Sequence, residues 1–168
     1  MKVSITNQSP LHRFLKKNIL YVAALIELVV FDHLSKYFAE YFLGAQKTIV
    51  IVPNYFSLSV SHNSAIAFSL PVSGKLVALF TPLLLAAIII MVKNSFDTSR
   101  VLTKIALVLL CAGTIGNFID RVWRGYVVDF LAPSFFPSFN LADAYLSIGV
   151  VILIAGYHYL AKTPELTA

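Results

Sequence analysis

The sequence predicts an all-α membrane protein with four transmembrane helices and a small sheet outside them. Of the 168 residues, 58% are hydrophobic and only 12% are charged, with a mean hydropathy of +0.81. These values are far from those of an ordinary soluble domain. Several apolar runs also approach or exceed the length needed to cross a bilayer. One stretch near residue 50 has the pattern of strands instead.

The predicted spans are residues 18–42, 75–92, 101–120 and 141–160, within a single integral membrane domain of residues 1–168. The first span follows a polar, basic segment that resembles the charged region of a signal peptide. It lacks a clear cleavage site of small residues, so we expect it to be retained. The second span, Leu76–Val92 at its core, has no charge, and the third has only Lys104 near its start.

Residues 44–73 do not have a helical pattern. The run Thr48–Val52 is rich in β-branched residues, Pro53-Asn54 is a turn signal, and Ser57–Ser61 alternates polar with apolar residues. These features predict a small sheet. Because open sheet edges are not tolerated in lipid, we expect the sheet to rest on the membrane surface.

The basic residues predict the orientation of the protein rather than a nucleic-acid partner. The net charge is +5, but the basic side chains are scattered among apolar runs and form no stripe. Four spans put both termini on one side, where the Lys and Arg count is eight against four on the other side. We therefore expect cytoplasmic termini. The eight are Lys2, Arg13, Lys16, Lys17, Lys93, Arg100, Lys104 and Lys162, and the four are Lys47, Lys75, Arg121 and Arg124.

Metal and cofactor sites are not predicted. The single cysteine, Cys111, lies in an apolar run, which excludes an intrachain disulfide and favours a buried, inert thiol. The four histidines are spread over different segments, and no glycine-rich phosphate loop is present.

Acidic residues are concentrated between Cys111 and Asp143. Three of the eight acids, Asp120, Asp129 and Asp143, lie there at predicted helix ends. Carboxylates at the edge of a membrane are costly and usually functional. Asp129 and Asp143 lie on different elements joined by a short loop, so they can face each other. Such a pair shares one proton and can act as base and acid toward water and substrate, without a metal.

Two structural alternatives apply to the same residues. Asn140 and Asp143 are also suited to be the N-cap and first-turn acid of a helix. Likewise Asn117, Asp120 and Arg121 have the spacing of a hydrogen-bonded knot that ends a helix. The convergence of three acids beside asparagines on one membrane face favours a functional site.

A further charged pair lies inside the first span. Asp32 and Lys36 are four residues apart, so they share a helix face and can form an ion pair. They could merely neutralise each other, with Lys36 reaching toward the headgroups. They could equally support the site, and the sequence leaves both possibilities open.

Five motifs follow one another along the chain: Asp32-His33-Leu34-Ser35-Lys36, Asn63-Ser64-Ala65-Ile66-Ala67-Phe68, Gly116-Asn117-Phe118-Ile119-Asp120-Arg121, Val127-Val128-Asp129-Phe130 and Phe139-Asn140-Leu141-Ala142-Asp143. With these motifs the chain resembles the lipoprotein signal peptidases (signal peptidase II), membrane aspartic proteases that remove signal peptides from bacterial prolipoproteins. The resemblance covers most of the chain.

The resemblance implies a role for each motif residue. Asp129 and Asp143 would be the catalytic pair. Asn63, Asn117, Arg121 and Asn140 would bind substrate, and Asp32, Lys36 and Asp120 would be structural supports. No metal and no cofactor would take part.

The resemblance also implies the reaction and its setting. The expected enzyme is a monomeric endopeptidase of the bacterial plasma (inner) membrane that cuts on the N-terminal side of a diacylglyceryl-modified cysteine. Its partners would be diacylglyceryl-modified prolipoproteins and membrane lipids, with no nucleic acid. An extracytoplasmic β-rich cradle and a periplasmic loop would cover an active site near the extracytoplasmic face.

The sequence departs from the family pattern at a few positions. Ala65 stands where the family usually has Gly, Ala112-Gly113 replaces a usual glycine pair, and His33 replaces a usual Gln. The loop from Asp129 to Asn140 is also short. Alanine adds a methyl group and restricts the backbone, so the path of the chain beside Asn63 is open to change.

Two other functions are conceivable. A small proton- or solute-transport subunit could use membrane acids as a relay, and Glu27 favours that hypothesis. A relay needs acids staggered through the membrane, whereas Asp120, Asp129 and Asp143 lie at one face. An inactive, substrate-binding relative is also possible, but the intact Asp129 and Asp143 pair argues against it.

Overall fold

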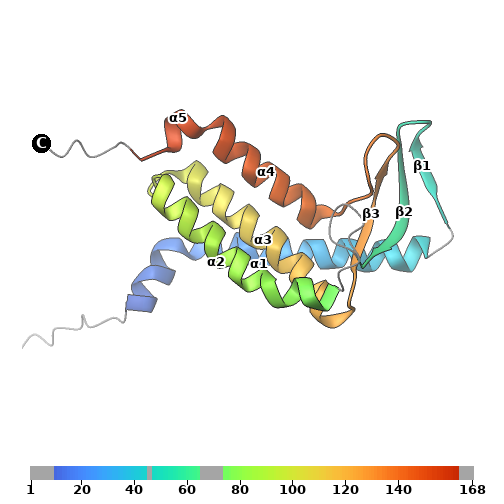
Figure 1. Ribbon diagram of the computed structural model, residues 1–168, viewed down its shortest axis with the longest axis horizontal. Coiled ribbons are helices and arrows are strands. Elements are labelled where there is room, and N and C mark those ends of the chain that lie inside the picture. Colours follow the sequence, from blue (N-terminus) through green and yellow to red (C-terminus); the bar gives the residue numbers. More distant parts are fainter. Residues whose placement is uncertain (1–9, 45–46, 65–73, 163–168) are drawn as a thin grey trace, which may run out of the picture.

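The computed structural model describes residues 10–44, 47–64 and 74–162. The elements in chain order are α1 (Pro10–Leu43), β1 (Ile49–Val52), β2 (Phe56–Asn63), α2 (Gly74–Ser95), α3 (Val101–Trp123), β3 (Val127–Pro133), α4 (Leu141–Ala155) and α5 (Tyr157–Leu160). The long helices lie side by side, and the sheet stands at one end of them (Figure 1). The protein is therefore mostly helical, with a small sheet.

Three helices are long and apolar enough to cross a membrane: Asn18–Leu43, Lys75–Ser95 and Val101–Trp123. The fourth, α4, has 15 residues. At 1.5 Å per residue it is about 22 Å long, which is less than the roughly 30 Å of a hydrocarbon core. The span predicted over 141–160 corresponds to two helices, because the helix is interrupted at Gly156 between α4 and α5. The break turns Leu160 back into the apolar cluster described below.

The sheet has the order β1-β2-β3, and both pairs are antiparallel. β1 and β2 confirm the strands predicted near residue 50, and Asn54 in the turn between them has a φ of 65°. β3 was not predicted, because residues 121–139 were expected to form a loop. Its first four residues are all buried, so its sequence lacks the alternation that marks a half-exposed strand. Pairing of β2 with β3 sets Ser61 opposite Asp129, two residues before Asn63.

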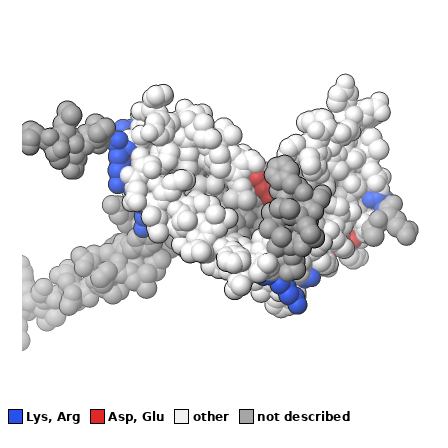
Figure 2. Space-filling model, viewed as in Figure 1, with Lys and Arg blue, Asp and Glu red and all other residues white. Residues whose placement is uncertain are grey.

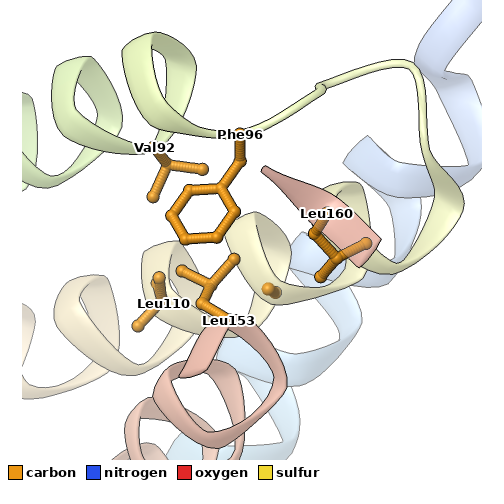
Figure 3. Close-up of a cluster of buried hydrophobic side chains, with 6 residues drawn as sticks. Val92, Phe96, Leu110, Leu153 and Leu160 are labelled. Carbon is orange, nitrogen blue, oxygen red and sulfur yellow. The ribbon is translucent and has the colours of Figure 1, made fainter. Parts of the chain in front are cut away.

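An apolar cluster holds the helices together at the end away from the sheet. It consists of Val92, Phe96, Ala106, Leu110, Leu153 and Leu160, which come from α2, α3, α4, α5 and the residue after α2. In Figure 3 the ring of Phe96 points between Val92 and Leu153. All six side chains are at most 7% exposed.

Small residues let α3 approach its neighbours at the end near the sheet. A Cβ atom on Gly113 would overlap the carbonyl oxygen of Ala142, and one on Gly116 would lie 2.6 Å from Asp32 Oδ2. Backbone therefore touches backbone or side chain where larger residues would hold the helices apart. This packing brings the polar residues of α1, α3 and α4 together.

Candidate active site

Asp129 on β3 and Asp143 in the first turn of α4 are both bound by one residue, Asn140. The Asn140 side-chain amide donates to Asp129 Oδ1 at 2.7 Å, and its main-chain N–H donates to Asp143 Oδ2 at 3.3 Å. Asp129 is 2% exposed and Asn140 is fully buried, whereas Asp143 is only half-buried. The structure thus brings the two predicted acids to one place.

The remaining carboxylate oxygens accept from two other asparagines. Asn63 Nδ2 donates to Asp129 Oδ2 at 3.0 Å, and Asn117 Nδ2 donates to Asp143 Oδ1 at 2.7 Å. Each of the four oxygens thereby receives an uncharged N–H donor. Amide donors orient a carboxylate without supplying a proton that can dissociate. The pair is therefore held in place while the two acids alone carry the exchangeable protons.

The setting of Asp129 favours its protonated form. Burial is the largest cause, and the nearby charge of Asp143 adds to it; together they raise the pKa of Asp129 to about 6. The amide donors Asn63 and Asn140 act in the opposite direction, because they stabilise the charged carboxylate. Asp129 consequently binds a proton far more readily than an ordinary aspartate.

A buried cation lies behind the two acids. Lys36 Nζ donates to Asp32 Oδ2 at 2.7 Å and to Asn117 Oδ1 at 3.2 Å, and it forms an ion pair with Asp120 Oδ2 at 2.8 Å. Lys36 and Asp32 are both fully buried. The predicted ion pair between them is confirmed, but Lys36 does not extend toward headgroups. It connects α1 to α3 instead.

Asp32 and Asn117 extend this cluster toward Asp143. Asp32 Oδ1 accepts the main-chain N–H of Ala142 at 2.9 Å, which ties α1 to the start of α4. Asn117 Oδ1 accepts from Asn140 Nδ2 at 3.3 Å as well as from Lys36. A continuous polar network therefore joins the buried cation to both acids.

Both structural alternatives are partly right. Asn140 and Asp143 form a complete capping box, since Asp143 N–H also donates to Asn140 Oδ1 at 3.0 Å. Helix capping and pairing with Asp129 are thus compatible. In the expected knot, Arg121 donates to the Asn117 carbonyl at 3.3 Å, while Asn117 and Asp120 meet only through Lys36. Among the described residues Arg121 forms no ion pair, so it is not paired with Asp129 or Asp143.

A second ionic contact was not predicted. Arg124, just after α3, pairs with Glu40 near the end of α1, and Glu40 Oε1 also contacts His62 Nε2 at 3.1 Å. The His62 ring stacks on Tyr126 at 4.3 Å. This cluster ties β2 to α1 and α3 beside Asn63. Because Glu40 and Arg124 are 84 positions apart, no local pattern could have revealed their contact.

An aromatic pocket of about 510 Å³ opens beside Asp143. Phe56, Phe135, Phe136 and Phe139 line it together with the start of α4. Figure 2 shows an acidic patch in the hollow between the helices and the sheet. Of these four phenylalanines, only Phe139 lies in one of the five sequence motifs. The pocket can hold an apolar segment next to a carboxylate, which suits acid–base chemistry on an amphipathic chain.

Other residues named in the sequence analysis lie outside the described residues or at the rim of the buried cluster. Ala65 and residues 66–68 of the second motif lie outside the described residues, as do the ends of the chain at 1–9 and 163–168. His33 Nδ1 lies 3.4 Å from Asp32 Oδ2, at the rim of the buried cluster. In the described part of the chain, no three His, Cys, Asp or Glu side chains are grouped as metal ligands.

Comparison with known proteins shows which family the chain belongs to. A family profile described as Signal peptidase (SPase) II matches residues 24–159. A lipoprotein signal peptidase of Pseudomonas syringae pv. tomato is 33% identical over 148 residues, which cover 82% of this chain and 85% of that protein. One from Moorella thermoacetica is 36% identical over 130 residues, covering 77% and 86%.

A solved structure, described as a bacterial membrane enzyme determined by the in meso method at 2.3 Å resolution, superposes with a TM-score of 0.71. Its sequence is 29% identical, and the match covers 81% of this chain and 86% of the other. Sequence and fold therefore agree along most of the chain. The protein belongs to the signal peptidase II family.

Proposed function

We propose that the protein is a lipoprotein signal peptidase whose catalytic residues are Asp129 and Asp143. The observation that carries this assignment is the pair of acids itself. Two carboxylates from different elements share Asn140, each of their oxygens has an amide donor, and an aromatic pocket opens beside Asp143. Membership of the family makes the protein an aspartic peptidase that acts on prolipoproteins.

In the proposed mechanism one proton is shared by the two acids. In the active form we assign this proton to Asp129, whose pKa burial raises to about 6, and Asp129 donates a hydrogen bond to the scissile carbonyl oxygen. Ionised Asp143, which faces the pocket, takes a proton from a water molecule as that water attacks the carbonyl carbon. The proton on Asp143 then passes to the leaving amine, the C–N bond breaks, and the pair returns to its starting state.

The other polar residues have positioning roles in this proposal. Asn117 on α3 orients Asp143, while Asn140 before α4 and Asn63 on β2 orient Asp129. Arg121 has no ionic partner among the described residues, so its half-buried guanidinium is available to substrate carbonyl groups. Asp32, Lys36 and Asp120 support Asn117 from behind.

We further propose four membrane crossings with cytoplasmic termini, the fourth made by α4 and α5. Figure 2 shows basic side chains at the helix ends away from the sheet and a second group near the sheet. The end away from the sheet carries Lys93, Arg100 and Lys104, and the sequence adds Arg13, Lys16 and Lys17 at the start of α1. Their position favours that end as the cytoplasmic one. A reporter fused at the C-terminus should then behave as cytoplasmic, and one inserted near Pro133 as extracytoplasmic. The opposite pair of results would reverse the orientation.

The substrate should bind with its scissile bond at the outer membrane interface. Its diacylglyceryl chains would remain in lipid, where buried chains contribute about 0.8 kcal/mol per CH₂. Cleavage would fall on the N-terminal side of the modified cysteine. The transport alternative has less support, since Glu27 is exposed on α1 while Asp32, Asp120, Asp129 and Asp143 meet at one end of the helices.

The decisive experiment uses the purified full chain and a diacylglyceryl-modified prolipoprotein peptide, with the products identified by mass. We expect one cut immediately before the modified cysteine, with much slower cleavage of the unlipidated peptide. Enzyme carrying Asp143→Asn is the matched control for a contaminating protease. Equal cleavage of both peptides would refute recognition through the lipid, and equal cleavage by the variant would refute the assigned site.

A further inference from the structure

A second, larger cavity lies at the end of the helices away from the acids. It has a volume of about 760 Å³ and is a groove between α1 and α2, with α3 as its floor. Both α1 and α2 pack against α3. The groove is lined by Tyr21 and Leu25 of α1, Ile89 and Lys93 of α2, and Lys104 and Cys111 of α3. The proposed mechanism uses none of these residues.

The groove is polar at one end and apolar along its length. Lys93, Ser99 and Lys104 lie around the turn between α2 and α3, where the helices end. Leu25, Ile89 and Cys111 continue the walls toward the middle of the helices. Lys104 and Cys111 are seven residues apart on α3, so the apolar part extends about 10 Å inward. This arrangement matches an amphiphile with its head at the helix ends and its chains among the spans.

The charge at the mouth of the groove is positive and not neutralised nearby. Neither Lys93 nor Lys104 forms an ion pair within the described residues. Lys104 Nζ lies 5.2 Å from the centre of the Tyr21 ring, which is a cation–π contact rather than a charge partner. The acid in the adjoining turn, Asp97, is already bound by Ser99 and by Arg100 at 3.5 Å.

We propose that this groove binds an anionic phospholipid, with the phosphate between Lys93 and Lys104 and the acyl chains along Leu25, Ile89 and Cys111. Basic pockets between transmembrane helices suit anionic lipid headgroups. The two ammonium groups disfavour a basic peptide segment, and a zwitterionic lipid would neutralise them less well. On α3, Lys104 at the mouth of the groove lies 13 residues from Asn117, roughly 20 Å, and Cys111 at its inner end lies six residues away, roughly 9 Å. None of the residues that line the groove takes part in the proposed mechanism. The proposal is therefore independent of the peptidase assignment.

The test is native mass spectrometry of the full chain in detergent, titrated with three probes. These are phosphatidylglycerol, phosphatidylcholine with the same acyl chains, and glycerol phosphate without chains. We expect adducts to persist with phosphatidylglycerol only. Equal retention of phosphatidylcholine would mean a nonspecific apolar groove, and equal retention of glycerol phosphate would mean an anion site unrelated to lipid. Either result would overturn the proposal.

Substitution of the two lysines tests whether phosphatidylglycerol binds in this groove. Each lysine near an anionic lipid is worth about fivefold in affinity, so Lys93→Gln with Lys104→Gln should weaken phosphatidylglycerol binding roughly 30-fold. The matched control, Lys47→Gln with Lys75→Gln, removes the same charge at exposed positions outside the groove and should leave the affinity unchanged.

Two further variants guard against misfolding as an explanation. Lys93→Arg with Lys104→Arg keeps the charge and should retain binding. Cys111→Trp fills the apolar part and should abolish binding while both lysines remain. Unchanged affinity in the double glutamine variant, or an equal loss in the control, would show that the lipid binds elsewhere.

Discussion

The two halves of α3 hold the protein together by different means. Toward its N-terminus, Ala106 and Leu110 pack into the apolar cluster with α2, α4 and α5 (Figure 3). Toward its C-terminus, Asn117 and Asp120 contact Lys36, and Asn117 also contacts Asp143 and Asn140. One helix thus has an apolar contact region at one end and a polar network at the other.

The two ends of α3 should therefore contribute differently to stability and to catalysis. Apolar contacts depend on area and shape, so a lost methyl group weakens the packing but leaves no unsatisfied group. In the polar network the contacts are directional, and removing one partner leaves a buried charge or donor unpaired. Changes in the network should therefore affect both turnover and stability, whereas changes in the cluster should affect stability alone.

The largest effect is expected from the two acids. Asp129→Asn and Asp143→Asn should each lower turnover roughly 10²–10⁴-fold, because an amide cannot exchange the shared proton. Turnover is measured with the lipidated peptide, and membrane insertion is checked in parallel. Asp97→Asn is the control, since Asp97 lies in the turn at the other end of the helices. Near-normal turnover for Asp143→Asn would show that Asp143 only caps α4 and is not catalytic.

Lys36→Met should destabilise the protein by about 3–5 kcal/mol, because Asp32 and Asp120 would lose their buried counter-charge. Turnover of the remaining folded protein should also fall, since Asn117 loses a donor beside Asp143. Thermal unfolding and turnover are measured on the same preparation. A variant as stable as the original protein would show that the cation is not essential to the packing.

Leu110→Ala should reduce the free energy of unfolding by about 2–5 kcal/mol through a cavity in the apolar cluster. Turnover per folded molecule should stay the same, because Leu110 packs in the apolar cluster and is not one of the residues whose hydrogen bonds form the polar network. Comparison with Lys36→Met at equal loss of stability then separates the two ends of α3. A large fall in turnover for Leu110→Ala would contradict the separation.

The pH dependence of stability should show the burial of Asp129. Its pKa is about 6 in the folded protein and about 3.9 when unfolded, so the folded state binds the proton more tightly. The protonated Asp129 therefore stabilises the folded protein fully below about pH 4. As the pH rises toward 6 this stabilisation is lost, and the free energy of unfolding falls by at most about 3 kcal/mol. Melting temperatures across pH 4–7 measure it. Asp129→Asn should flatten this trend, and Leu110→Ala should keep it.

The sequence by itself determined the membrane class, the three long helices, the strands β1 and β2, and the acids that meet at the site. Each depends on information within a short segment: an apolar run, a β-branched run or a motif. The capping box of Asn140 and Asp143 is also local, because its two residues are three positions apart. Ion pairing of Asp32 with Lys36 follows from their spacing in the same way.

Only the tertiary structure decided the remaining features. β3 is buried against the helices, so its sequence shows no alternation, and the break at Gly156 serves the packing of Leu160. The contacts of Asn63 with Asp129, Lys36 with Asp120, and Glu40 with Arg124 join residues 66 to 84 positions apart. Such contacts depend on how closely α1, α3, α4 and the sheet approach one another. That distance is set by small residues such as Gly116, whose role appears only when the helices are packed.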